Sequence, residues 1–232
     1  MKRIITGIVL SLLAHSPVHA WEFYTDGPIE PSIVLGLEHR PGEPVQSNYH
    51  GTERLRDTFR DDENMSHFGL HGLTAGERSD YPCMVEFDWT QLTGGNPPRD
   101  EMGMNGRAFN RCGPRGPVQN SVQNLSVDHG LGSWATGMTV CNTSNGRMKG
   151  IRLRGTRYSL DTDTKQIRED GNNTEQFARA NCGGNWGTNV SCRSGQIIVG
   201  VEVFYMPDRN GRREADSIIG FQLFCRALMV RP

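Results

Sequence analysis

Two acidic residues of one predicted strand are the first candidates for chemistry in this sequence. Glu86 and Asp88 alternate in the segment CMVEFDW, and alternating residues of a strand face the same side. Two carboxylates on one face can serve glycoside hydrolysis, in which their separation decides the stereochemical outcome. A solvated sheet face explains the same pair and is the simpler interpretation.

A second acid–base candidate is His129, which follows Asp128 in a glycine-flanked loop. Adjacent side chains of an extended chain point to opposite faces, so a surface turn is the better interpretation. The sequence contains no nucleophile elbow, no zinc-protease motif and no phosphate-binding glycine loop. We therefore expect no catalytic residue beyond the weak candidates Glu86, Asp88 and His129, and no cofactor. An enzyme is disfavoured but stays open.

Metal binding is the next chemistry to weigh, because His50, His67 and His71 lie close together in the sequence. No acidic residue or cysteine stands at ligand spacing from them, which favours solvated surface histidines. The cysteines form no C-x-x-C pair, so zinc is disfavoured there too. We expect no metal site.

Sugar binding suits the residue types better, because aromatic rings stack on sugars and polar groups bond to hydroxyls. Trp134, Trp186 and Tyr205 lie in or beside predicted loops, although recurring tryptophans are more often core residues. The polar loop Pro207–Ser217 joins two predicted strands. The candidate ligand-binding residues are therefore Asp208, Arg209, Arg212, Tyr205, Trp134 and Trp186.

The N-terminus and the composition limit the classes to which the protein can belong. Lys2 and Arg3, a short apolar run and Val18-His19-Ala20 predict a signal peptide over residues 1–20. No later segment is apolar enough to span a bilayer, and a net charge of -1 without a basic patch argues against nucleic acid. Six cysteines in an exported chain favour three disulfides.

The remaining chain divides into two parts. Residues 21–80 are polar and without cysteine, and we interpret them as an N-terminal extension of weak or conditional structure. From 81 to 232, short apolar and alternating runs such as QIIVGVEVFY and SIIGFQLFC are separated by turn residues. This pattern predicts an all-β sandwich, barrel or prism.

The β part contains an internal repeat. The order Trp, Cys, Gly and alternating apolar residues runs from Trp134 to GRMKGIRLR and again from Trp186 to SGQIIVGVEV, while a third, earlier unit matches weakly. A Phe precedes the last cysteine of each unit. If every unit opens and closes with a cysteine, the pairs are Cys83–Cys112, Cys141–Cys182 and Cys192–Cys225.

These landmarks resemble the repeat of the vitelline membrane outer layer protein family. The matching residues are Trp186-Gly187, Cys192, Gly195, Gly200, Val201, Val203, Ala215-Asp216-Ser217, Ile219-Gly220-Phe221, Leu223 and Cys225. The resemblance implies a β-prism of three Greek-key sheets with pseudo-three-fold repeats. It also implies a role in an extracellular coat or in carbohydrate binding. It is good in the last unit, fair from Trp134 to Gly155, poor before that and absent from 21–80.

The leading hypothesis is a secreted protein that binds a glycan or a component of an extracellular matrix or coat. In a bacterium its place would be the periplasm or the cell surface. One alternative is a glycan-cleaving or glycan-transferring enzyme. Another is a secreted effector or toxin in which residues 21–80 serve as a pro-segment.

Overall fold

The computed structural model describes residues 22–36, 46–51, 68–78, 81–92, 104–105, 109–127, 132–142, 148–161, 163–178, 186–206 and 217–231. The predicted signal peptide, residues 1–20, lies outside them. Apart from one short 3-10 turn at Gln119–Ser121, the regular structure of this part of the chain is β-strand. The predicted all-β class is confirmed.

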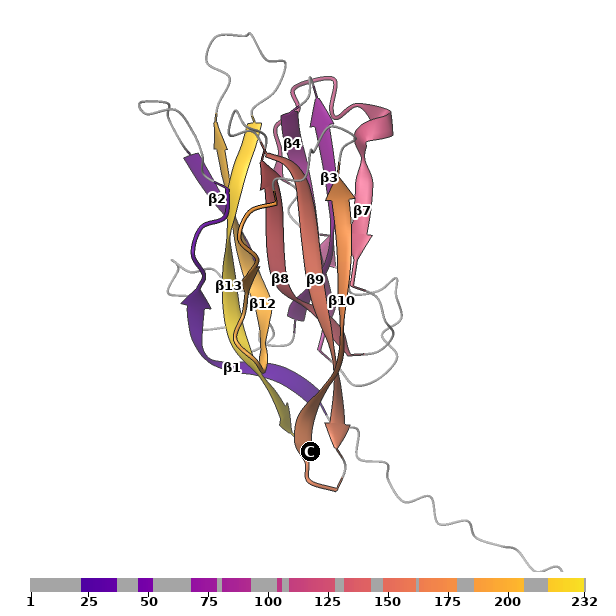
Figure 1. Cartoon of the computed structure of the whole chain (residues 1–232), viewed down its shortest axis with the longest axis vertical. Helices are drawn as coiled ribbons and strands as arrows, with labels where there is room; N and C mark the ends of the chain where they lie inside the picture. The colour runs from indigo at the N-terminus through magenta and orange to yellow at the C-terminus, as the bar shows by residue number, and fades with distance from the viewer. Residues whose placement is uncertain are drawn as a thin grey trace, which may run out of the picture.

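The strands form three antiparallel sheets (Figure 1). Sheet A has the order β1 (Glu22–Pro31), β13 (Ser217–Arg231), β12 (Gln196–Met206), β2 (Gln46–Gly51). Sheet B has the order β5 (Met104–Asn105), β4 (Tyr81–Gln91), β3 (Phe68–Arg78), β7 (Gln123–Ser126), and β6 (Phe109–Asn110) also pairs with β4. Sheet C has the order β10 (Gln166–Ala178), β9 (Met148–Asp161), β8 (Ser133–Asn142), β11 (Val190–Ser191).

All three sheets repeat one Greek-key order. Each has a central pair of consecutive strands, β3–β4, β8–β9 or β12–β13. The next strand lies beside the second of the pair, and a fourth returns beside the first. Sheet A follows the same order only because β1 and β2, from the start of the chain, complete the pair made at its end. The predicted β-prism-like fold of three Greek-key sheets is confirmed.

The inner faces of the three sheets share one core. Its largest cluster joins residues such as Phe87 of sheet B, Leu153 of sheet C and Phe221 of sheet A, none more than 1% exposed. Burial of each such side chain contributes roughly 1.5–3 kcal/mol. A second cluster, around Trp134 and Tyr158, also joins strands of different sheets. The sheets therefore stabilise one another, and their outer faces are left to meet solvent.

The predicted boundary at residue 80 needs correction. The described parts of 21–80 contain β1, β2 and β3, and the first two close sheet A while the third is central in sheet B. Phe23 and Leu35 are buried in the core. The low apolar content of this segment does not predict these strands, because strand formation depends on packing and pairing within the sheet as well as on the residues of the strand itself. No separate arm lies within 22–36, 46–51 and 68–78.

The three sheets do repeat one strand order, but the repeat predicted from the sequence is offset from it by one strand. The sequence pattern matched β9 to β12, whereas β12 occupies the place of β8 in the shared order and β13 that of β9. Trp134 lies in β8, and Trp186 lies beside the edge of the same sheet. The two tryptophans are therefore not equivalent positions.

Two of the predicted disulfides are present in the described chain, Cys83–Cys112 and Cys192–Cys225. Cys141 is disulfide-bonded as well, and its predicted partner Cys182 lies outside the described residues. Disulfides are consistent with an oxidising, extracellular location. Within the described ranges no helix is long and apolar enough to cross a membrane.

Candidate functional site

The carboxylates of Glu86 and Asp88 lie on the outer face of sheet B, as their alternation predicted. Each is half-buried, and their neighbours Val85 and Phe87 point into the core. Asp88 pairs across the sheet with Gly72, where an added Cβ would lie 3.2 Å from Asp88 Oδ2. The Asp88 carboxyl therefore packs against Gly72, a position that has no side chain.

This placement changes the titration of Asp88. Burial, and in second place the charge of Glu86, raise the pKa of Asp88 above its ordinary value. The folded protein then binds the proton more tightly than the unfolded chain, so ionised Asp88 opposes folding at neutral pH. Below the ordinary pKa of 3.8 both states are protonated and the effect vanishes.

We expect Asp88→Asn to raise the melting temperature at pH 7. The gain should shrink as the pH falls toward the ordinary pKa of an aspartate, because the wild-type carboxyl then becomes neutral as well. Thermal melts of both proteins between pH 3 and pH 8 measure the difference. A gain that is constant over this range, or a loss at pH 7, would contradict the assignment.

Two of the predicted sugar-binding rings are core residues. Trp134 is 2% exposed and packs against the rings of Phe23 and Tyr158, with centroids 5.6 and 6.2 Å away. Tyr205 is 7% exposed, and its hydroxyl donates to Gln46 Oε1 at 2.7 Å. Neither ring presents an open face to a sugar in this conformation.

Four other predicted site residues, His129, Asp208, Arg209 and Arg212, lie outside the described residues, and their roles stay predictions. Of the histidines considered for metal binding, His50 belongs to β2 of sheet A and His71 to β3 of sheet B. Within the described ranges, no group of three or more His, Cys, Asp and Glu side chains could hold a metal ion.

The outer side of sheet C carries an organised polar surface. We call it the sheet C face and define it by Thr139, Arg152, Arg154, Trp186, Asn189 and Ser191. Thr139 Oγ1 donates to Asn189 Oδ1 at 2.9 Å, and Asn189 Nδ2 donates to Ser191 Oγ at 3.3 Å. These bonds join β8 to the segment that carries β11, and they fix the Asn189 amide at the sheet edge.

A second polar row crosses the same sheet in the other direction. The hydroxyls of Thr136 and Thr156 are 2.9 Å apart, and Thr156 Oγ1 donates to Asn172 Oδ1, also at 2.9 Å. This row runs from β8 through β9 to the exposed Asn172 on β10. Hydroxyls and amides thus line the sheet in fixed orientations.

Trp186 reaches this face because residues 186–192 follow the edge of β8. Trp186 forms a bridge with Cys141, and Gly187 N donates to Val140 O at 2.9 Å. Cys192 N donates to Thr136 O at 2.7 Å at the other end. The half-buried indole lies under Arg152, whose guanidinium carbon is 4.0 Å from the ring centroid. The indole therefore holds the guanidinium against the sheet.

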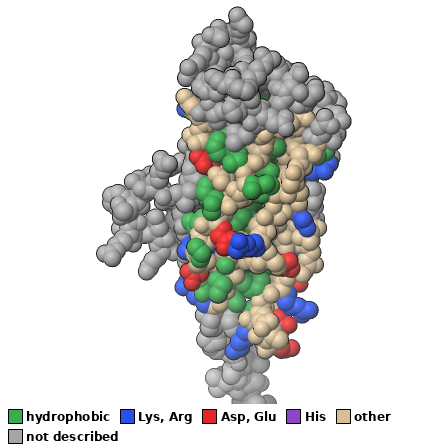
Figure 2. Space-filling model, turned by 60° about the vertical axis from the view of Figure 1, so that its left-hand side comes forward, with side chains coloured by type: hydrophobic (Ala, Val, Ile, Leu, Met, Phe, Trp, Pro, Cys, Tyr) green, Lys and Arg blue, Asp and Glu red, His purple; other side chains and the backbone are tan. Residues whose placement is uncertain are grey.

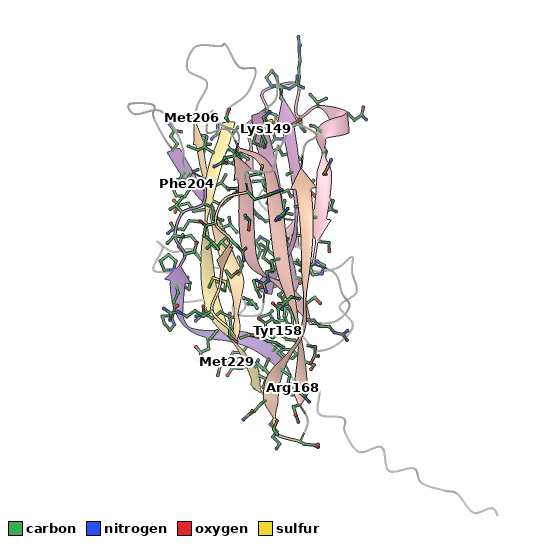
Figure 3. All side chains as sticks on the ribbon, in the orientation of Figure 1. Lys149, Tyr158, Arg168, Phe204, Met206 and Met229 are labelled. Carbon is green, nitrogen blue, oxygen red and sulfur yellow. A yellow bond between two sulfur atoms is a disulfide. The ribbon has the colours of Figure 1, made fainter. Side chains whose placement is uncertain are left out.

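Arg154 lies two residues beyond Arg152 on β9, the strand that carries Lys149 and Tyr158, both labelled in Figure 3. Its cross-strand partner on β8 is Gly137. An added Cβ at Gly137 would lie 2.7 Å from Ser191 Oγ and 2.9 Å from Val190 O. Only glycine lets the edge strand β11 approach β8 at this point.

The three outer faces differ in chemistry although the sheets share one order. On β12 of sheet A, Glu202, Phe204 and Met206 occupy the half-buried positions that alternate with buried residues, and hydrophobic side chains gather on that side of the molecule in Figure 2. Sheet B carries Glu86 and Asp88. Sheet C carries the two arginines.

Sequence reasoning named Trp186 but missed Arg152, Arg154, Thr139 and Asn189. The segment GRMKGIRLRG was interpreted as an alternating strand, and only its apolar positions were used. The arginines occupy the other positions of the same alternation, which is the signal that was available. The partnership with Trp186 depends on the edge pairing, which no local pattern reveals.

The fold and this surface define the class: a disulfide-stabilised, β-prism-like protein of three Greek-key sheets with a polar, arginine-bearing face. No family model matches the chain, and no curated protein matches it. The likeness to the vitelline membrane family therefore stays a resemblance.

Three solved structures are similar in outline. A prostate-specific WGA16 glycoprotein lectin has 10% identity and a TM-score of 0.34, covering 82% of this chain and 96% of its own. The biofilm matrix protein Bap1 of V. cholerae has 10% identity and a TM-score of 0.39, and the match covers 90% of this chain and 24% of the Bap1 chain. A mannose-specific jacalin-related lectin from Morus nigra, in complex with mannose, has 8% identity and a TM-score of 0.34. The match covers 88% of this chain and 95% of the lectin chain. These values are too low to transfer a ligand or a site.

Proposed function

We propose that this protein is an extracellular glycan-binding protein and that the sheet C face is its binding surface. The observation that carries the proposal is the linked Thr139, Asn189 and Ser191, whose hydroxyl and amide groups are oriented by one another. Each of these groups both donates and accepts hydrogen bonds, as a sugar hydroxyl does. A surface that is ordered before binding loses less entropy when the ligand arrives.

The disulfides support the extracellular part of the proposal, because such bonds persist in oxidising compartments. A role within an extracellular coat or matrix follows if the glycan is itself part of that coat. The resemblance to the vitelline membrane family is in keeping with such a role.

Thr139→Val is the sharpest test, because it keeps the shape and removes the hydroxyl that holds Asn189. We expect glycan affinity to fall roughly 2- to 10-fold, the range of one neutral hydrogen bond. A glycan array on the wild type first identifies a ligand, and titration calorimetry then compares the variants. The matched control is Thr74→Val, which removes a half-buried threonine hydroxyl from the outer side of sheet B. Equal affinity of the Thr139 variant and the wild type would contradict the assignment of the surface.

A glycan-cleaving activity is the second candidate, and the raised pKa of Asp88 beside Glu86 favours it. A carboxyl with a raised pKa keeps its proton more readily and can act as a general acid. Reducing-end assays on the glycans that the array identifies separate the two functions. Release of product by the wild type, abolished in Glu86→Gln, would establish an enzyme, whereas intact glycan supports binding alone.

A further inference from the structure

We infer that the outer side of sheet B is a second glycan-binding surface, which takes sugars that carry protonated amines. We call it the sheet B face and define it by Thr74, Glu86, Asp88, Asn124 and Ser126. The inference adds a site to the proposed one, on which it rests for the kind of ligand, and it is tested with a different polymer. Two features carry it: the polar groups of the sheet C face recur here at equivalent positions, and the charged residues beside them differ.

One irregularity aligns the three sheets residue by residue. In each sheet, the register of the central pair shifts directly before a glycine, which is Gly72 in β3, Gly137 in β8 and Gly200 in β12. Sheets B and C also share the bond that ends their edge pairing. Val127 N donates to His71 O at 3.0 Å, and Cys192 N donates to Thr136 O at 2.7 Å. The acceptor directly precedes the glycine in both sheets, so positions around Gly72 and Gly137 correspond one to one.

The hydroxyl and amide residues of the sheet C face recur around Gly72. The edge residue that pairs with Gly72 is Ser126, just as Ser191 pairs with the equivalent glycine of sheet C. Two residues further along β3, Thr74 pairs with Asn124. The sheet C face has threonine and asparagine at the same two positions. Asn124 is exposed, and Thr74 and Ser126 are half-buried, so all three reach the surface.

The fold itself does not demand this set of residues, because sheet A has others at the equivalent positions. Glu202 stands where the other two sheets have threonine, and it pairs with Tyr49 of β2 and not with an asparagine. Gly51 lies opposite Gly200, where the other two sheets have serine. Strand pairing at this place therefore works without the set. Its presence on two outer faces points to a use that these two faces share.

The second central strand gives the two faces different charges. Glu86 and Asp88 of β4 pair with Thr74 and Gly72, whereas both equivalent residues of sheet C are arginines. Because Gly72 has no side chain, the Asp88 carboxyl comes close to β3, with Oδ2 3.2 Å from the place of an added Cβ. The two carboxyls start about 7 Å apart along the strand. Each row of the sheet B face thus joins a carboxyl on β4 to a polar group on β7.

A protonated amine suits these carboxyls. Burial, and in second place the charge of Glu86, raise the pKa of Asp88. An ammonium group beside Asp88 would offset both effects, since an opposite charge favours the ionised form. Hydrogen bonds between an ammonium and a carboxylate are about twice as strong as those between neutral groups. The hydroxyls and the amide of the same face can then donate to, and accept from, the hydroxyls of the amino sugar.

A glycan fits this face better than a basic peptide. Peptides that bind to sheets add a strand at an edge or place side chains in apolar pockets. The residues of the sheet B face lie on the flat outer side of β3, β4 and β7, and they are polar. A sugar offers hydroxyls to such a surface at every unit, whereas a basic peptide offers only its charges to the carboxyls.

The test uses the full mature protein and two immobilised polymers with one backbone: chitosan, which has free amines, and fully N-acetylated chitosan, which has none. The buffer is mildly acidic, so that the amines are protonated. We expect stronger retention by chitosan, weakened by salt because exposed charges are screened. In Glu86→Gln with Asp88→Asn, chitosan retention should fall roughly 10- to 100-fold, as two hydrogen bonds lose their charge. Asp88→Asn is expected to stabilise the fold, so unfolding would not explain the loss.

The matched control is Asp163→Asn with Asp170→Asn, which removes the same charge from two exposed aspartates of the β9–β10 hairpin. It should leave chitosan retention unchanged. Thr74→Val should lower chitosan retention roughly 2- to 10-fold, the range of one neutral hydrogen bond. The same variant should leave the affinity for the ligand of the sheet C face unchanged, and Thr139→Val should show the reverse pattern.

The inference and the proposed function fail differently. Equal retention by both polymers would overturn the selection of amines. Equal loss in the aspartate control, or retention by polylysine as strong as by chitosan, would reveal plain charge attraction and overturn the second surface. Absence of chitosan retention, while Thr139→Val still weakens binding of the array ligand, would overturn this inference alone. Chitosan retention that depends on Thr74, with an array ligand indifferent to Thr139→Val, would overturn only the assignment of the sheet C face.

Discussion

A shortened chain that begins at residue 52 should lose its cooperative melt and aggregate. This deletion removes β1 and β2 and so exposes both edges of the β12–β13 pair. It also removes Phe23 and Leu35 from the core. The lost burial alone amounts to roughly 3–6 kcal/mol, a large part of the roughly 5–15 kcal/mol that a domain has in total. Unpaired strand edges then offer templates for association.

Circular dichroism melts and sedimentation velocity measure this outcome. Deletion of residues 1–20 is the control, because β1 begins at Glu22. That shorter deletion should melt as the full chain does. A chain from residue 52 that stays monomeric and melts cooperatively at the wild-type temperature would contradict the role of β1 and β2 in sheet A.

The second large effect is expected from removing the Cys192–Cys225 disulfide by changing both cysteines to serine. The bond closes a loop with a sequence separation of 33. Opening a loop of this size should cost roughly 4 kcal/mol, or about 8–16 °C in melting temperature for a domain of this size. Differential scanning calorimetry under reversible conditions measures the change.

The position of this disulfide predicts more than a loss of stability. Cys192 ends the segment that carries Trp186, Asn189 and Ser191, and Cys225 lies in β13 of sheet A. The bond therefore fastens the edge of the sheet C face to the neighbouring sheet. The matched variant lacks Cys83–Cys112, with a separation of 29, and should lose similar stability. Only the Cys192–Cys225 variant should also lose glycan affinity at temperatures where both remain folded. Equal affinities would contradict this coupling.

The fold class could be predicted because local signals carry it. Runs such as QIIVGVEVFY alternate or are wholly apolar, and turn residues bound them. Strands β1 and β2, the first two of 21–80, could not be predicted in this way. Their formation depends on β13 and β12 offering free edges, and the partners come from the far end of the chain. The sequence of an edge strand contains little information about a pairing that depends on its partner strand.

The candidate site was predicted only in part, for a related reason. Trp186 was named for its residue type, and its exposure and its contact with Arg152 agree with a surface role. Trp134, named on the same ground, is a core residue. The difference arises because the first lies on an outer sheet edge and the second at the start of an inner strand. The spacing of the tryptophans does not contain that information, whereas the alternation of Arg152 and Arg154 with buried residues does.

Because sheet A joins the two ends of the chain, it also decides when folding can finish. Sheets B and C each draw their strands from one continuous stretch, so they can form while later residues are still being made. Sheet A must wait for β13, which pairs Arg231 with Glu22. Contacts between residues so far apart in sequence close slowly. Sheet A is therefore the expected rate-limiting step of folding, and until it closes β1 and β2 are strands without partners.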